Sequence, residues 1–132
     1  NVVISDTIGF IQNLPPTLIE SFKSTLMESL YADIILHVID VSDERMEAKV
    51  KTVQAIIKEL GLASKKQMYV FNKTDQLNGG FHRNLDRLKS IYADFTPQFV
   101  SVKTKNGIIN LKSVLLSSTQ TTLKNLKSSL LL

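Results

Sequence analysis

Four consecutive residues, Asn72-Lys73-Thr74-Asp75, combine side chains that could recognise a nucleotide base. They follow the apolar run Met68–Phe71, which has the length of a buried strand. Guanine presents two N–H donors on one edge, and a carboxylate such as that of Asp75 only accepts hydrogen bonds, so it can pair with both. Adenine lacks this donor pair, and a site built around the pair rejects a base without it. These residues therefore indicate a guanine-binding loop.

Each polar residue of this loop has a candidate role. Asp75 would accept the two donors of the base, and Asn72 would brace the loop and reach the base's other edge. The aliphatic stem of Lys73 would cover the ring. The alternative is a polar turn after a buried strand, because Asn and Asp are common in turns.

A second candidate is the sequence Asp6-Thr7-Ile8-Gly9, which follows the apolar segment 1–5. Mg²⁺ prefers oxygen ligands and usually keeps several waters, so Asp6 is a candidate magnesium ligand through water. Gly9 has no side chain, so its N–H could approach a terminal phosphate closely, next to Thr7. The pattern D-x-x-G is short, and a plain strand-to-loop turn would explain it equally well.

A third candidate is Ser101-Val102-Lys103, at the end of another short apolar run. It resembles the loop of GTP-binding folds in which a small residue offers its backbone N–H to the guanine oxygen and a lysine stem covers the ring. Val102 is bulkier than the alanine that is usual there, but the contact uses the backbone. We therefore include Ser101, Val102 and Lys103 among the nucleotide-binding residues.

Strand-like and helix-like segments alternate along the chain and would position these three motifs. The apolar runs predict strands at about 1–5, 34–39, 67–71 and 99–101. Helical spacing of apolar residues predicts helices at about 15–30, 43–60, 81–92 and 107–115. Ser42 and Asp43 are expected to cap the second helix, with Asp40 in the loop before it. The pattern favours an α/β fold with a parallel sheet wound on both faces and ligands at the carboxyl ends of its strands.

The composition fits one globular domain and excludes several classes of protein. The 132 residues are 43% hydrophobic and include no cysteine, which excludes disulfides and cysteine-ligated zinc. No apolar run approaches the roughly 20 residues of a membrane helix, and the start shows no signal-peptide pattern. We therefore expect a cytoplasmic protein without a membrane span. His37 lies within an apolar strand and is expected to be a hydrogen-bonded core residue.

The positive net charge of the chain is concentrated near its end. From Lys103 onwards there are five lysines and no Asp or Glu, whereas the whole chain has a net charge of +4. Such a segment can bind RNA or an anionic surface, although a solvated helix surface would look the same. Residues 117–132 are rich in Ser, Thr and Lys and favour a further helix or a linker.

Together, the three motifs and the segments around them resemble the HflX family of translation-associated GTPases. The resemblance runs to about Leu115 and is specific in Asp6–Ile11 and in His37–Asp43. It implies a three-layer Ras-like P-loop GTPase fold with a mostly parallel sheet. It also implies GTP and GDP as ligands, Mg²⁺ as cofactor, GTP hydrolysis, and association with the large ribosomal subunit and its RNA. In Ras-like GTPases a glutamine that orients water follows the glycine, and here Phe10 stands in that place, so no catalytic residue is assigned.

One part of the family pattern is missing. A phosphate-binding loop needs G-x-x-x-x-G-K-S/T, and the five glycines, at 9, 61, 79, 80 and 107, do not form it. We therefore interpret residues 1–116 as a partial G domain, incomplete because the phosphate-loop strand is missing, and 117–132 as a basic tail. In the Ras-like sheet that strand lies between the segments 1–5 and 34–39, so these two segments should not pair directly. The alternative function is a non-catalytic interaction module, derived from a G domain, that binds ribosomal RNA or protein.

Overall fold

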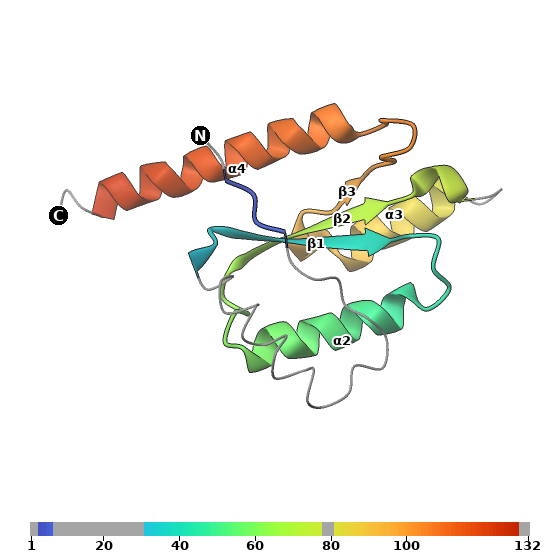
Figure 1. The fold of residues 1–132 in the computed structure, drawn as a ribbon, viewed down its shortest axis with the longest axis horizontal. Helices are drawn as coiled ribbons and strands as arrows, with labels where there is room; N and C mark the ends of the chain where they lie inside the picture. Colours follow the sequence, from blue (N-terminus) through green and yellow to red (C-terminus); the bar gives the residue numbers. More distant parts are fainter. Residues whose placement is uncertain (1–2, 7–30, 78–80, 130–132) are drawn as a thin grey trace.

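A three-stranded parallel sheet forms the centre of the molecule (Figure 1). The computed structural model describes residues 3–6, 31–77 and 81–129. The strands are β1 (Ile34–Asp40), β2 (Lys66–Asn72) and β3 (Gln98–Phe99), in the order β1-β2-β3. β1 and β2 pair along their whole length, from Ile34 opposite Lys66 to Asp40 opposite Asn72. The predicted strands at 34–39 and 67–71 are confirmed, and β3 is shorter than predicted.

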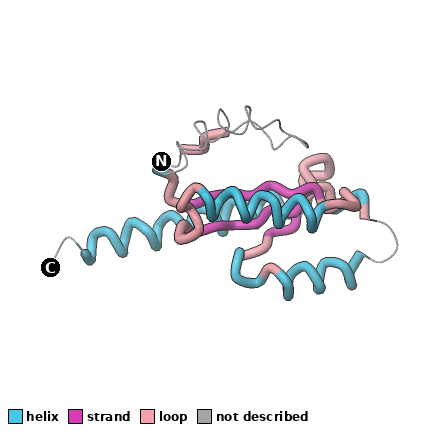
Figure 2. Tube along the Cα trace, turned by 90° about the horizontal axis from the view of Figure 1, so that it is seen from below, coloured by secondary structure: helices cyan, strands magenta, loops and turns pink. Residues whose placement is uncertain are grey.

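Within the described residues, three α-helices cover the two faces of this sheet. They are α2 (Met46–Glu59), α3 (Phe81–Ile91) and α4 (Ile108–Ser129). Residues of α2 and α3 share one buried cluster with Tyr69 and Phe71 of β2, so both helices pack on the same face. α4 lies on the opposite side of the sheet from α2, and in Figure 2 α2 crosses in front of the strands. The predicted α/β architecture, with helices on both faces, is confirmed.

The ends of α2 show how the sequence defines this helix. Its buried side chains, Met46, Val50, Val53 and Ile57, form the predicted apolar stripe. At its C-terminus Gly61 takes φ +71°, the Gly61 N–H donates to the Lys58 carbonyl at 3.0 Å, and the Leu62 N–H donates to the Ile57 carbonyl at 2.9 Å. This is the Schellman arrangement, in which a left-handed glycine satisfies the last carbonyls of a helix.

Two local expectations were wrong. Val3–Asp6 is not a strand and lies outside the sheet, and Val3 and Ile4 are 90% and 75% exposed. The expectation that this segment does not pair with β1 holds for these residues; the other residues of segment 1–5 and the helix predicted at 15–30 lie outside the described residues. Neither Ser42 nor Asp43 is the N-cap of α2, because the helix begins at Met46 and its N-cap is Arg45.

Aromatic side chains hold the α2–α3 side of the core together. Tyr69 and Phe71 are fully buried. Tyr69 stacks on Phe95 with ring centroids 4.3 Å apart, and Phe71 stacks on Phe99 at 5.2 Å. These pairs fix β2 relative to β3 and to the turn after α3, since stacked rings bury a large apolar area in a defined geometry.

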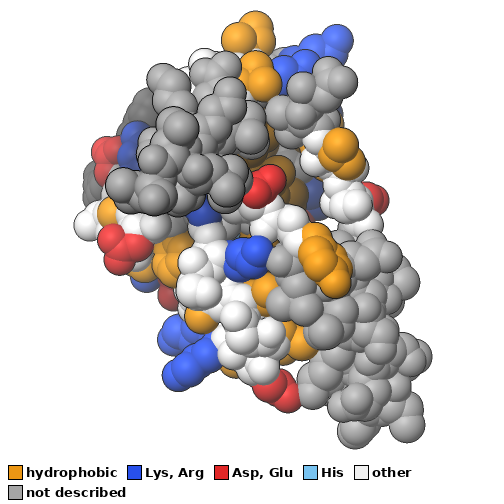
Figure 3. Space-filling view, turned by 90° about the vertical axis from the view of Figure 1, so that its left-hand side faces the viewer, with side chains coloured by type: hydrophobic (Ala, Val, Ile, Leu, Met, Phe, Trp, Pro, Cys, Tyr) orange, Lys and Arg blue, Asp and Glu red, His pale blue; other side chains and the backbone are white. Residues whose placement is uncertain are grey.

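The segment after β3 is a tight turn followed by one long helix. Ser101 and Asn106 form an isolated bridge that closes the turn, and α4 then runs without a break from Ile108 to Ser129. None of the helices in the described ranges combines the length and the apolar character needed to cross a membrane. On the face drawn in Figure 3, Lys and Arg side chains are scattered among hydrophobic and uncharged ones.

Gly107, which follows this turn, packs closely against β3, and Gly61 at the end of α2 provides a control in the same left-handed conformation. A Cβ at Gly107 (φ +74°) would lie 2.3 Å from the Phe99 carbonyl oxygen, whereas a Cβ at Gly61 (φ +71°) would meet no described atom within 4 Å. Gly61→Ala should cost about 1 kcal/mol of unfolding free energy from backbone strain alone. Gly107→Ala should cost about 1–3 kcal/mol more, because β3 must shift. Urea denaturation measures the unfolding free energy of each variant. Equal losses in the two variants would contradict the close approach of Gly107 to the Phe99 carbonyl.

Acidification should destabilise the fold through His37. Its ring lies edge-on to Tyr69 at 4.9 Å, and its Nδ1 is buried without a hydrogen-bond partner among the described residues, so the expected hydrogen bond is not found at this nitrogen. Burial lowers the pKa of His37 from 6.5 to about 4. The unfolded chain therefore binds more protons than the folded chain between these values, and stability falls as the pH drops through this window.

We expect His37 to remove about 2 kcal/mol of unfolding free energy between pH 7 and pH 5. His37→Phe keeps an aromatic ring against Tyr69 and does not titrate, so it should lose much less over the same range. Urea denaturation at the two pH values compares the proteins. The same pH dependence in both would show that His37 does not cause it.

Candidate functional site

Two loops meet at the carboxyl edge of the sheet, and they carry most of the residues selected from the sequence. The first loop leaves β2 at Asn72, and the second follows β3 from Ser101 to the bridge at Asn106. Because β2 and β3 are parallel neighbours, both loops leave the same edge. The ligand-binding crevice of open α/β sheets lies at this edge.

Asn72 joins the two loops through its side chain. Its Oδ1 accepts a hydrogen bond from the Lys73 backbone N–H at 2.8 Å and from the Val102 backbone N–H at 3.1 Å. The buried Thr74 adds a second link, because its N–H and its hydroxyl both donate to the Val100 carbonyl, at 3.2 and 3.0 Å. Since the amide oxygen of Asn72 is used within the protein, its NH₂ group is the end that can serve a ligand.

Asp75 is oriented by the second loop. The Ser101 hydroxyl donates to Asp75 Oδ1 at 2.5 Å, and the Thr104 backbone N–H donates to the Ser101 hydroxyl at 3.1 Å. Ser101 is only 1% exposed, whereas Asp75 is exposed in the short turn η2 (Thr74–Gln76). A carboxylate has about four acceptor positions, so one bond to Ser101 leaves room for two further donors.

Lys73 takes a left-handed backbone conformation, with φ 65° and ψ 33°. Its ammonium group pairs with Asp40 Oδ2 at 2.6 Å. The hydrogen bond to Asp40 raises the pKa of Lys73. Desolvation raises the pKa of Asp40, but the bonds from Lys73 and Ser42 outweigh it and leave that pKa below its usual value.

The remaining residues of the second loop face solvent. The side chain of Val102 is 63% exposed, and Lys103 is exposed as well. The Val102 N–H, which the sequence suggested as a donor to guanine, donates to Asn72 in this structure. A base oxygen at this N–H would have to share it with Asn72 or replace that bond.

Of the residues selected for phosphate and magnesium, the structure describes only Asp6. Asp6 is exposed, and Thr7, Gly9 and Phe10 lie outside the described residues. Within the described part of the chain, no group of three or more His, Asp or Glu side chains could hold a metal ion. A single carboxylate such as Asp6 fits Mg²⁺ only if waters or phosphates supply the other oxygen ligands.

Sequence reasoning missed the contact between Asp40 and the first loop. Asp40 was expected to lie in the loop before α2, and it does hold the turn after β1 by accepting a hydrogen bond from the N–H of Ser42 at 3.0 Å. Its pairing with Lys73, which lies 33 residues away, has no local signal in the sequence. The one available hint is that both strands end in a polar residue at the same edge, Asp40 and Asn72.

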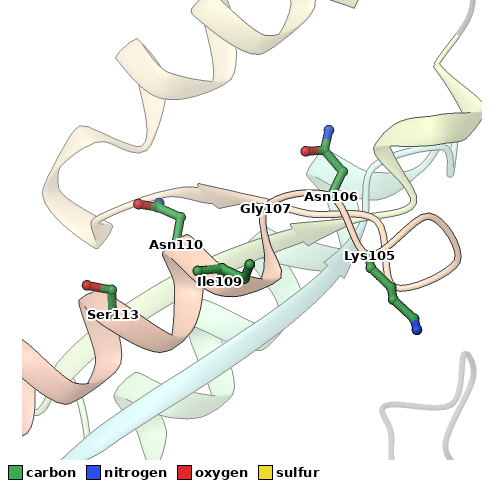
Figure 4. A pocket seen from close by; sticks show the side chains of 6 residues that line it. All are labelled: Lys105, Asn106, Gly107, Ile109, Asn110 and Ser113. Carbon is green, nitrogen blue, oxygen red and sulfur yellow. The ribbon is translucent and has the colours of Figure 1, made fainter.

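A shallow depression lies beside the start of α4 and adjoins the end of the second loop. It is lined by Lys105, Asn106, Gly107, Ile109, Asn110 and Ser113. In Figure 4 the Lys105 side chain extends away from those of Asn110 and Ser113. The depression includes neither Asn72 nor Asp75, so it is not the candidate base-binding site.

Similar sequences are found among curated proteins, although no family model matches the chain. The GTPase HflX of Lacrimispora saccharolytica is 39% identical over 126 residues, which cover 96% of this chain and 27% of that protein. The GTPase HflX of Magnetococcus marinus is 38% identical over 116 residues, covering 86% of this chain and 25% of that protein. The chain thus spans about a quarter of the length of these relatives.

Solved structures give a consistent result. A GTP-binding protein from the archaeon Sulfolobus solfataricus, crystallised in complex with GDP, matches with a TM-score of 0.74 at 25% identity. The match covers 87% of this chain and 40% of that protein. The fold is thus the α/β fold of a GTP-binding protein in incomplete form, and the chain belongs to the HflX family of GTPases.

Proposed function

We propose that the two loops are the guanine-binding part of a site for GTP and GDP, in a protein that hydrolyses GTP. The observation that carries this proposal is the direct bonding of Asp75 to Ser101 and of Asn72 to Val102. These bonds hold a carboxylate, an amide and the backbone of the second loop at one edge of the sheet. This arrangement offers acceptors and donors to a flat polar base without rearrangement of the backbone.

Each residue has a distinct role in this proposal. Asp75 accepts from the two guanine N–H groups, and Ser101 orients its carboxylate. The NH₂ group of Asn72 donates to the other edge of the base. The Val102 N–H, which donates to Asn72 in this structure, is shared with the guanine oxygen or turns to it. The stems of Lys73 and Lys103 cover the ring faces, since their methylene groups can pack on an apolar surface while the ammonium stays in water.

The phosphate end of the nucleotide would lie toward the Asp6 motif. Asp6 would hold Mg²⁺ through water, and Thr7 and Gly9 would lie beside the terminal phosphate. The ion would neutralise charge on the phosphate oxygens. Phe10 cannot orient a water molecule by hydrogen bonding, so hydrolysis would depend on another group or on a bound partner.

The wider setting follows from the family. We propose that the whole protein is cytoplasmic and acts at the large ribosomal subunit and its RNA, with residues 1–116 contributing part of the G domain. Residues 117–132 would form a basic tail, although α4 continues through residue 117 without a break.

A second candidate function is a non-catalytic module that binds ribosomal RNA or protein. It is favoured by the exposed lysines Lys103, Lys105 and Lys112, in a segment without Asp or Glu. The organised hydrogen bonds of the two loops nevertheless favour the nucleotide site.

Replacing Asp75 should remove the preference for guanine. In Asp75→Ala the two base N–H groups lose their acceptor, so binding of GMP should weaken at least about tenfold while binding of AMP changes little. NMR titration of the chain with each nucleotide measures both affinities. Asp86→Ala, which removes an exposed carboxylate paired with Lys89 on α3, is the control and should leave the preference intact.

The same variant separates the two candidate functions. RNA binding that weakens with salt and survives Asp75→Ala would support the interaction module. Equal affinities of the unsubstituted chain for GMP and AMP would contradict the guanine site.

The 132-residue chain by itself should bind GTP weakly and hydrolyse it negligibly. It contains no phosphate-binding loop, so the backbone amides and lysine that normally hold the β- and γ-phosphates are missing. Calorimetric titration with GTP and Mg²⁺, together with an assay of phosphate release, checks this expectation. A submicromolar dissociation constant would contradict it.

A further inference from the structure

Asp40 lies at the point where β1 meets the guanine-binding loop. It is opposite Asn72 in the last pair of the β1–β2 ladder, and the next N–H, that of Val41, donates to the Asn72 carbonyl at 3.0 Å. The backbone of Asp40 is therefore fixed relative to the start of the loop. Its side chain is the one carboxylate of β1, and it contacts the Lys73 ammonium.

The two oxygens of this carboxylate have different partners. Oδ1 accepts from the Ser42 backbone N–H at 3.0 Å and from the Ser42 hydroxyl at 2.6 Å. The same hydroxyl lies 3.0 Å from Oε1 of Gln76, within the loop itself. Oδ2 is then directed to the Lys73 ammonium at 2.6 Å. The bonds from Ser42 thus orient the carboxylate, so that its second oxygen faces the Lys73 ammonium.

Lys73 has two further carboxylates within its electrostatic reach, Asp43 in the turn after β1 and Asp75 in its own loop. Asp75 is two residues further along the same loop, and its charge also favours the protonated form of Lys73. If the ammonium left Asp40, Asp75 would be the nearby anion of the loop. An ammonium on Asp75 would occupy the acceptor positions that two base N–H groups need.

We propose that Asp40 is a positioning residue of the guanine site and acts through Lys73. This inference rests on the proposed function of the two loops. Asp40 holds the ammonium on the β1 side, which keeps the carboxylate of Asp75 free for the base and directs the Lys73 stem along the loop. The pair is partly exposed, so its contribution is modest, and it affects the selection of the base more than the stability of the fold.

The test replaces Asp40 by asparagine, which retains an oxygen acceptor for Ser42 and removes the charge that holds Lys73. NMR titrations of the 132-residue chain should show GMP binding about threefold to tenfold weaker. AMP binding should stay unchanged. Asp86→Asn is the control, because Asp86 is an exposed carboxylate on α3 that pairs with Lys89 and not with Lys73. It should leave both affinities within about twofold of the original values.

A double-mutant cycle shows whether Asp40 acts through Lys73. Lys73→Met keeps an unbranched stem and removes the ammonium, so Asp40→Asn should have no further effect in that background. Equal losses in both backgrounds, or equal losses for GMP and AMP, would indicate a structural role and overturn the proposal. So would an unchanged GMP affinity in Asp40→Asn.

The unsubstituted chain separates this inference from the function on which it rests. If it binds GMP no better than AMP, the guanine site itself fails, and the role of Asp40 fails with it. If it prefers GMP and Asp40→Asn keeps the full preference, only the role of Asp40 fails. Thermal unfolding followed by circular dichroism confirms that each variant is folded.

Discussion

The burial of β2 on both faces is the constraint on which the rest of the structure depends. Its four central residues, Met68, Tyr69, Val70 and Phe71, are at most 4% exposed. Successive side chains of a strand point to opposite faces, so such a strand needs cover on both sides. α2 and α3 cover the face of Tyr69 and Phe71, and α4 lies on the opposite side from α2. The loop that follows β2 therefore begins from a strand with little freedom to move.

Asn72, the last residue of β2, connects this rigid strand to both loops of the candidate site. Asn72 is paired with Asp40 through the ladder, and its side chain accepts hydrogen bonds from the backbone of both loops. Lys73 then takes a left-handed conformation, which costs a residue other than glycine about 1 kcal/mol or more. Strain of this kind persists where the surroundings determine the conformation, and such positions are common in binding loops.

Neutral and charged interactions make different contributions at this edge. The loops are joined by neutral hydrogen bonds of Asn72 and of the buried Thr74, and a buried polar group that loses its partner is costly. The Lys73–Asp40 pair is partly exposed, and pairs of this kind contribute little to stability. These bonds, together with the bond from Ser101 to the Asp75 carboxylate, hold the two loops in place. The Lys73–Asp40 pair instead fixes the position of one flexible charged group.

The sequence by itself determined the order and type of the main elements and the edge at which their polar loops meet. Apolar runs and helical spacing are local properties, so β1, β2, α2 and α3 were predictable from them. The motif after β2 indicated Asn72 and Asp75 because a polar residue directly after a buried strand marks the carboxyl edge. The sequence also indicated the family, through short motifs that occur in a fixed order.

Only the tertiary structure decided which side chains contact one another. Val3–Asp6 has an apolar, strand-like sequence but lies outside the sheet, because pairing depends on a neighbouring strand and not on the segment alone. Asp40 and Lys73 are 33 residues apart, and they meet because the parallel register places the ends of β1 and β2 side by side. Local periodicity shows which face of an element is buried, but the partner of a long charged side chain depends on where the chain brings other elements.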